Sequence, residues 1–230
     1  MGKSLLVLAS NSPRRRELLA LGGWMFKTRP AEVDESQHPG EAPSAYVLRL
    51  AESKARTCAA SPRIRGMVSA SEDLTILAAD TAVVDGKAIL GKPKDMAEAV
   101  EMLRRLRSRT HQVFTGIAVM RLSDGNLAMD LCVTDVPMRA YSDDEIDTYV
   151  ATGDPLDKAG AYAIQHPKFH PVDMMSSCYA SVMGLPLCHL TRTLRQFDIA
   201  PKTDISAGCQ SSLNYICPIS AAVLHGEQAG

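Results

Sequence analysis

A short apolar strand followed directly by a capped helix is the feature that most limits what this chain can fold into. Residues 5–9 form an apolar run typical of a buried strand. Ser12 then suits a helix N-cap, Pro13 suits the first helical position, and Gly22-Gly23 provides a stop. A strand that leads into a helix over so few residues favours an α/β fold.

Strand and helix patterns continue along the chain and include hairpins. Asp85-Gly86 suits a type I′ turn within 83–90, and Asp124-Gly125 joins two long apolar segments. Asp95 and Ser142 are N-caps followed three residues later by glutamate. Because hairpins interrupt the strand–helix units, we expect an α/β protein with a mixed, twisted sheet and flanking helices. The predicted strands lie after Trp24 and at 75–79, 83–90, 112–122, 127–138 and 161–164, and the predicted helices lie at 42–60, after Asp95, after Ser142 and at 187–197.

The chain divides near residue 198. With 230 residues, 46% of them hydrophobic, it is long enough to bury one core or two packed lobes. After Phe197 the residues become small and polar with little periodicity, apart from an apolar stretch at 219–224. We therefore expect a domain over 1–198 and a loosely structured C-terminal extension over 199–230.

Three arginines stand where a helix normally has acidic residues. Arg14, Arg15 and Arg16 fall in the first turn after Ser12, where the helix dipole is already positive. Unpaired backbone N–H groups and guanidinium groups together favour an anion such as phosphate. A solvated basic turn is the competing interpretation.

Composition narrows the classes of function. The formal net charge is −1 and aromatics are only 5%, so no basic, aromatic surface for nucleic acid is expected. No apolar run reaches the roughly 18 residues of a membrane span. The six cysteines are scattered and no signal-peptide pattern accompanies them, which predicts reduced thiols, a cytoplasmic protein and no zinc site. The histidines do not pair with a nucleophile motif, which argues against covalent catalysis.

Further charged residues stand at places suited to a site. Asp80 follows the apolar strand 75–79, where a carboxylate can hold a metal or accept a proton, although strand-ending aspartates are common. Lys92 in Gly91-Lys92-Pro93 can meet a phosphate, or it is an ordinary turn lysine. Residues 157–165 suit a binding loop or a plain connector. Phosphoryl chemistry needs both cations and carboxylates; the chain offers Arg14, Arg15, Lys54 and Lys92 with Glu35 and Asp80.

Separated motifs in this order resemble the Maf family of nucleoside triphosphate pyrophosphatases. They are Ser10-x-Ser12-Pro13-Arg14-Arg15, Ala79-Asp80-Thr81, Gly91-Lys92-Pro93, Thr115-Gly116, Asp157-Lys158-Ala159-Gly160-Ala161-Tyr162 and Gly184-Leu185-Pro186-Leu187. The resemblance covers about residues 4–197. It implies hydrolysis of a nucleoside triphosphate to the monophosphate and pyrophosphate with Mg²⁺ or Mn²⁺. It also implies two lobes around a cleft, as in inosine triphosphate pyrophosphatases, and often a homodimer.

The resemblance assigns expected roles. Asp80 is the expected proton acceptor for the attacking water and, with Glu35, the metal ligand. Arg15, Lys54 and Lys92, with Ser10 nearby, are expected to hold the substrate. Arg14, Thr81 and Gln165 match the dTTP/UTP subclass, with modified pyrimidine nucleotides as further candidate substrates.

Three positions depart from the family pattern: Ala78, His166-Pro167 and Ser177-Cys178. Together with the extension they motivate an alternative function, a nucleotide-binding regulator of cell division with little catalysis. The retained Asp80 favours the enzyme.

Overall fold

A six-stranded mixed sheet forms the centre of the computed structural model, which describes residues 3–66 and 72–229. The strand order is β2-β1-β3-β5-β6, and β4 pairs with β3 outside this path. The α/β fold with a mixed sheet expected from the sequence is confirmed. The strands are β1 (Lys3–Leu8), β2 (Phe26–Thr28), β3 (Glu72–Asp85), β4 (Ala88–Leu90), β5 (Thr110–Arg121) and β6 (Leu127–Pro137).

Strand β3 changes partner along one of its edges. Parallel β1 pairs with it as far as Leu77, and antiparallel β4 pairs with it from Val83. Residues 78–82 lie between these two pairings, while β5 pairs continuously along the other edge. The interruption therefore leaves a short stretch of β3 edge uncovered by a strand in the middle of the sheet.

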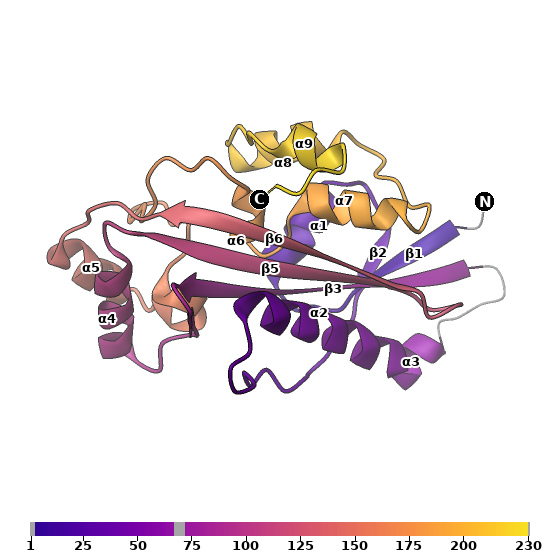
Figure 1. The fold of residues 1–230 in the computed structure, drawn as a ribbon, viewed down its shortest axis with the longest axis horizontal. Helices are drawn as coiled ribbons and strands as arrows, with labels where there is room; N and C mark the ends of the chain where they lie inside the picture. The colour runs from indigo at the N-terminus through magenta and orange to yellow at the C-terminus, as the bar shows by residue number, and fades with distance from the viewer. Residues whose placement is uncertain (1–2, 67–71, 230) are drawn as a thin grey trace.

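Helices cover both faces of the sheet (Figure 1). Helix α2 lies on one face, and α1, α6 and α7 lie on the other, while α4 and α5 stand at one end of the long strands. Their bounds are α1 (Pro13–Ala20), α2 (Pro43–Ala60), α3 (Pro62–Arg65), α4 (Met96–Leu106), α5 (Asp143–Val150), α6 (Tyr179–Val182) and α7 (Leu187–Arg195), with short 3₁₀ turns at Asp154–Asp157 and Ala159–Ala161.

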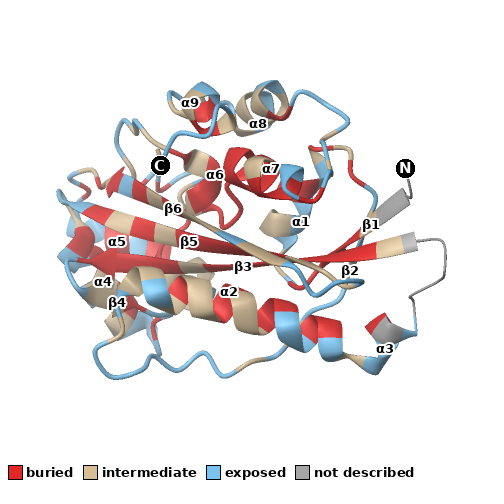
Figure 2. Cartoon of the chain, turned by 45° about the vertical axis from the view of Figure 1, so that its right-hand side comes forward, coloured by how far each residue is buried: buried red, intermediate tan, exposed pale blue. Residues whose placement is uncertain are grey.

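Separate apolar clusters divide the molecule into two lobes. On the wide part of the sheet, one cluster packs beneath α1 and α7 and another beneath α2. A further cluster joins α4 and α5 to the far ends of β3, β5 and β6 around Tyr141 and Tyr149. Buried residues run along β3 through both lobes (Figure 2). The long strands therefore connect the lobes.

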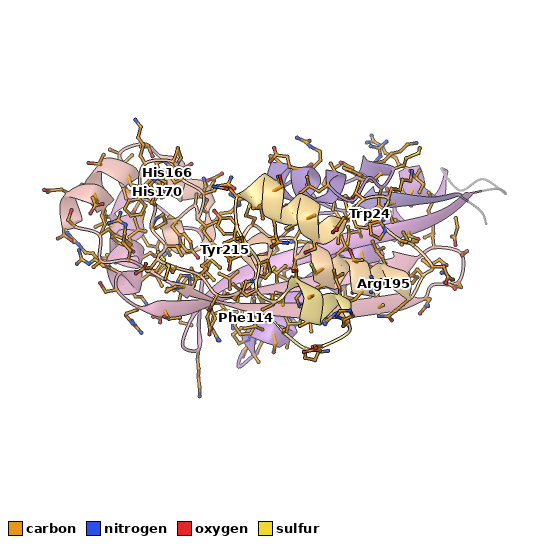
Figure 3. All side chains as sticks on the ribbon, turned by 90° about the horizontal axis from the view of Figure 1, so that it is seen from above. Trp24, Phe114, His166, His170, Arg195 and Tyr215 are labelled. Carbon is orange, nitrogen blue, oxygen red and sulfur yellow. The ribbon has the colours of Figure 1, made fainter. Side chains whose placement is uncertain are left out.

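The extension forms two helices, α8 (Ile205–Leu213) and α9 (Ser220–Leu224), and is more ordered than the loose structure expected from its sequence. Local caps explain part of this, since the Asp204 carboxylate accepts from the Ala207 N–H. Seen from above, both helices lie over the lobe that contains Trp24 and Arg195, away from His166 and His170 (Figure 3).

Several local predictions are confirmed and others are wrong. Ser12 caps α1, and Ser142 with Glu145 forms a full capping box on α5. The predicted end of a strand at Asp80 is wrong because β3 continues, paired with β5 as far as Val84 and with β4 as far as Asp85. The predicted strand at 161–164 is wrong, since positive φ angles at Gly160 and Ala161 bend the backbone out of an extended course. The predicted loop at 62–73 contains α3, and its residues 67–71 lie outside the described part.

Candidate active site

The first turn of α1 places Arg15 beside β3 rather than in solvent. Its Nε donates to the Gly184 carbonyl at 2.9 Å, and its two terminal nitrogens donate to Thr81 Oγ1 at 3.1 Å and Ser10 Oγ at 3.4 Å. Ser10 itself is buried and also accepts from the Ser12 N–H. Of the two interpretations of the arginine turn, the solvated one does not hold for Arg15.

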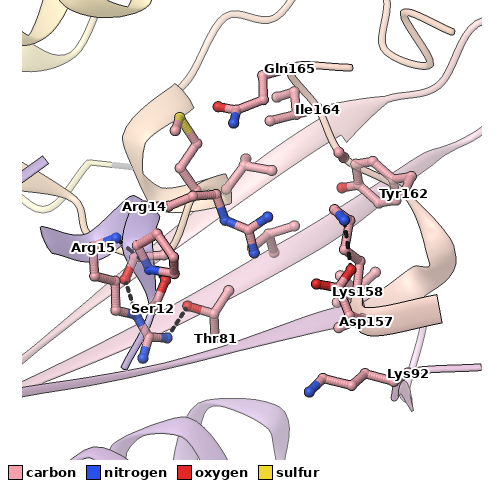
Figure 4. Close-up of a pocket in the computed structure, with 18 of the residues that line it drawn as sticks. Ser12, Arg14, Arg15, Thr81, Lys92, Asp157, Lys158, Tyr162, Ile164 and Gln165 are labelled. Atoms are coloured by element: carbon pink, nitrogen blue, oxygen red, sulfur yellow. Dashed lines mark hydrogen bonds and ion pairs between the residues drawn. The ribbon is translucent and has the colours of Figure 1, made fainter. Parts of the chain in front are cut away.

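A cavity of about 530 Å³ opens beside this turn. Arg14 and Arg15 of α1 form one side of it, Asp157, Lys158 and Tyr162 form the other, and Gln165 and Lys92 lie at opposite margins (Figure 4). The Nε atom of Arg14 is buried without a hydrogen-bond partner. An unpaired buried donor is costly, and this one belongs to a residue of the cavity wall. The structure thus brings together five of the predicted substrate-binding residues: Arg14, Arg15, Thr81, Lys92 and Gln165.

Lys54 joins the two predicted metal ligands. Its Nζ lies 2.6 Å from Asp80 Oδ1 and 2.6 Å from Glu35 Oε1. The Asp80 and Lys54 side chains are buried, whereas Glu35 approaches from an exposed loop with 59% of its side chain accessible. Helix α2 holds Lys54 on the sheet through apolar neighbours such as Ala51 and Ala55. These three residues do not line the cavity wall described above.

Burial and charge act in opposite directions on Asp80. Burial raises the pKa of its carboxyl above the usual value, and the Lys54 ammonium and Arg15 guanidinium limit the rise. The pKa of Arg15 is lowered by burial, opposed by the charge of Asp80. A buried carboxylate with a raised pKa is a better proton acceptor than an exposed aspartate.

Asp80 and Thr81 both lie in the stretch of β3 that no strand covers along one edge. Successive side chains of a strand point to opposite faces, so Asp80 meets Lys54 of α2 while Thr81 meets Arg15 of α1. Gly116 lies opposite Asp80 in the register. A Cβ there would stand 2.8 Å from the backbone of Val47, so glycine lets α2 approach closely.

The two carboxylates fit a divalent cation whose remaining ligands come from the substrate. Glu35 and Asp80 converge on one cationic group, the Lys54 ammonium. Among residues 3–66 and 72–229, no group of three or more His, Cys, Asp or Glu side chains is arranged to hold a metal. Mg²⁺ commonly uses only one or two carboxylates together with phosphate oxygens and water. This donor set therefore suits such an ion and not a site made of protein ligands alone.

Sequence reasoning missed two contributors. Lys158 stands in the cavity wall with its Nζ 2.6 Å from Asp157 and 3.0 Å from Asp154. The signal that could have identified it is the run 157–165, which suits a binding loop. Thr115, buried beneath Thr81, gave none beyond its place in a motif.

The departures from the family pattern lie away from the cavity surface. The centre of the His166 ring lies 4.7 Å from that of Tyr149, with the two rings tilted at 59°, and its Nδ1 accepts from the Phe169 N–H, so it faces α5. Cys178 is buried, and the Ser177 carbonyl accepts from Tyr215 of the extension at 2.8 Å. Ala78 is buried under α2. None of the three belongs to the cavity lining.

The remaining sequence predictions concern cysteines and membranes. All six cysteines are free thiols. Within the described ranges, the helices are too short or too polar to cross a bilayer.

Comparison with known proteins identifies similar chains along most of this sequence. Residues 5–197 match the family described as Maf-like protein. A dTTP/UTP pyrophosphatase of Geobacter sulfurreducens is 44% identical over 196 residues, which cover 85% of this chain and 98% of that relative. Relatives with the same name in Anaeromyxobacter dehalogenans and Escherichia coli O157:H7 are 46% and 42% identical, over 83% and 84% of this chain and 93% of each relative. With the arginine turn, the cavity and the Lys54-linked carboxylates in place, this chain belongs to the Maf-like protein family.

Proposed function

We propose that this protein hydrolyses dTTP and UTP to the monophosphate and pyrophosphate. The observation that carries the proposal is the arrangement of two neighbouring residues on β3. The buried Asp80 carboxylate is paired with Lys54, and Thr81 contacts Arg15 in the cavity wall. Hydrolysis of a phosphoanhydride needs a proton acceptor for water beside cations that stabilise the phosphate charge. The pyrophosphatase names of the relatives support the same reaction.

The proposal gives most residues the role that the family resemblance implies for them. Asp80 accepts the proton of the attacking water, and Lys54 holds the Asp80 carboxylate in place at 2.6 Å. Arg15 and Lys92 bind the triphosphate, whereas Arg14, Gln165 and Thr81 contact the nucleoside. Ser10 supports the Arg15 guanidinium. Modified pyrimidine nucleotides are candidate substrates of the same cavity.

A divalent cation, Mg²⁺ or Mn²⁺, would be held by Glu35 and Asp80. When bound, such an ion neutralises phosphate charge and lowers the pKa of a coordinated water. The convergence of both carboxylates on one ammonium supports this assignment. Lys54 would then share Glu35 and Asp80 with the ion and keep them close together.

Three broader properties belong to the same proposal. We propose a cytoplasmic protein, a homodimer, and a catalytic domain over 1–198 followed by a separate extension over 199–230. The end of the family match at residue 197 supports the division. Scattered free thiols support the location.

The decisive experiment is a product assay with purified protein, Mg²⁺ and a panel of nucleotides. We expect UTP and dTTP to give the monophosphate and pyrophosphate, and Asp80→Asn to lower turnover by about 10²-fold or more. Asp130→Asn is the matched control, because the Asp130 side chain is only 11% exposed and lies 2.6 Å from a cation, Arg192, outside the cavity. Intact UTP and dTTP, or an Asp80→Asn variant as fast as wild type, would refute the proposal. Tight nucleotide binding without turnover would instead favour the regulator.

A further inference from the structure

A chain of hydroxyl groups lies beneath Arg15. Thr81 on β3 stands opposite Thr115 on β5 in the sheet register, and their Oγ1 atoms are 3.0 Å apart. Thr115 is fully buried, and its hydroxyl donates to the Ser181 carbonyl at 2.9 Å. At the other end, Arg15 donates to Thr81 Oγ1 at 3.1 Å.

Counting protons fixes the direction of every bond in this chain. A threonine hydroxyl carries one proton, and an arginine side chain has donors only. The proton of Thr115 is committed to the Ser181 carbonyl, so towards Thr81 this hydroxyl is an acceptor. Thr81 is therefore the donor in that contact. The bonds all run from Arg15 through Thr81 and Thr115 to the carbonyl of Ser181.

We infer that Thr115 is a positioning residue of this site: it takes the only hydroxyl proton of Thr81, so that Thr81 meets the nucleotide as a hydrogen-bond acceptor and Arg15 stays fixed. The inference rests on the proposed function and deepens it. Thr81 then binds an N–H or O–H group of the nucleoside and not an ionised phosphate oxygen, which offers no proton. The donors that dTTP and UTP share are the base N3–H and the sugar 3′ hydroxyl.

Both ends of the chain are anchored in one tight turn. Arg15 Nε donates to the Gly184 carbonyl, and the Gly184 N–H donates to the same Ser181 carbonyl that accepts from Thr115. Gly184 has φ of 100°, and a Cβ on it would lie 3.1 Å from Arg15 Nε and 3.3 Å from Thr81 Oγ1. The turn thus depends on glycine and closes the network into a ring. A hydrogen-bond network closed in this way holds its members in one geometry.

Steady-state kinetics with Mg²⁺ and UTP test the inference. We expect Thr115→Val to raise KM by about five- to tenfold, with a smaller change in kcat. The reason is that the bond from Thr81 to Thr115 is lost, so the Thr81 hydroxyl proton no longer has a fixed direction. Thr115→Ser keeps the hydroxyl and should return KM to within about twofold of wild type. The matched control is Thr134→Val. Thr134 is a fully buried threonine of β6 whose hydroxyl also donates to a carbonyl, that of Cys178, and it takes no part in the hydrogen bonds that link Arg15 to Ser181. Its KM should be unchanged.

Non-additivity separates positioning from a general loss of stability. If Thr115 acts through Thr81, the double variant Thr81→Val/Thr115→Val should have the KM of Thr81→Val alone, whereas independent effects multiply. If Thr115→Val does not fold, Thr115→Cys replaces it in the same KM comparison, because cysteine is of similar size and is only a weak hydrogen-bond donor. The inference is overturned if Thr115→Val has a KM within twofold of wild type. It is also overturned if the effects of Thr81→Val and Thr115→Val multiply in the double variant. In both cases the proposed function stands. A wild-type protein without UTP hydrolysis removes both.

Two analogues identify the nucleoside donor. N3-methyl-UTP lacks the base donor, and 3′-deoxy-UTP lacks the sugar donor. We expect one of them to have a raised KM with wild type and little further change with Thr81→Val, because the lost contact is the same. If both analogues bind wild type as well as UTP does, Thr81 makes no such contact and the acceptor role is wrong.

Discussion

His111 shows how one buried residue makes folding depend on pH. It is 2% exposed, its Nε2 lies 2.8 Å from the Tyr162 hydroxyl, and its Nδ1 has no partner. Burial lowers the pKa of His111 to about 4 from 6.5. The unfolded chain therefore binds a proton at this residue between these pH values and the folded protein does not. The contribution of neutral His111 to the free energy of unfolding is fully present above pH 6.5. It is lost as the pH falls towards 4, by about 3 kcal/mol in all.

Replacing His111 should remove that dependence. We expect His111→Gln to lose less stability than wild type between pH 7 and pH 4.5, measured by urea unfolding at each pH. His225→Gln is the control, because His225 is exposed and makes no part of the contact between His111 and Tyr162. Parallel stability curves for wild type and His111→Gln would show that His111 titrates as it does in the unfolded chain.

Lys54 is the residue whose loss should most disturb the carboxylates. Without its ammonium, Glu35 and Asp80 lose the cation that each approaches at 2.6 Å, and the pKa of Asp80 loses its main lowering influence. We expect Lys54→Met to lower kcat for UTP by about 10²-fold. Lys87→Met, an exposed lysine of the β3–β4 turn, should match wild type. A Lys54→Met enzyme within fivefold of wild type would contradict this role.

At the scale of elements, the sequence predicted what local chemistry decides. Caps and turn residues placed α1, α5 and the β3–β4 hairpin, because each depends on neighbours within a few residues. The course of β3 past Asp80 depends on β5, some 35 positions away along the chain (Asp80 pairs with Gly116), and no local signal records it. The cations of the site were recognised by type, yet their division between the two faces of β3 followed only from the pairing.

Gly160 offers a test of how a loop shapes the cavity. It has φ of 70°, and a Cβ there would lie 2.9 Å from Val83 Cγ1, itself a cavity residue. Gly125 has the same φ of 70° in the β5–β6 turn with nothing within 4 Å. Alanine at either position should cost about 1 kcal/mol from the backbone alone.

Only Gly160→Ala should also affect the reaction. The clash with Val83 has to move the 159–163 segment that carries Tyr162 into the cavity, so we expect KM for UTP to rise several-fold. Gly125→Ala should leave KM unchanged. Thermal unfolding and UTP kinetics on both variants check this, and equal kinetics would show that the wall adapts to the added methyl group.

At the scale of the whole molecule, the extension is part of the packed structure. Trp24 donates to the Ala200 carbonyl at 3.0 Å, Arg195 of α7 donates to the Leu224 carbonyl at 2.7 Å, and Tyr215 reaches the segment before α6. Its composition predicted little of this, since small polar residues give weak periodicity. The contacts with Ser177 place the extension over one of the departures from the family pattern, a link that only the tertiary structure reveals.

Val223 is the residue that best tests whether this packing holds the extension in place. It is fully buried in α9, which contacts α7, whereas Ala221 on the same helix is exposed. An aspartate at 223 has to ionise in an apolar contact or be expelled from it. Because Asp80, Lys54 and the cavity lie in the remainder of the chain, we expect Val223→Asp to release the extension, lower Tm by several degrees and leave UTP turnover within about threefold of wild type.

Limited proteolysis followed by mass spectrometry should then show cleavage within 199–229 that Ala221→Asp resists. Equal cleavage of the two variants would mean that α9 packing does not hold the extension. Loss of turnover in Val223→Asp alone would mean that the extension supports the site through the segment before α6.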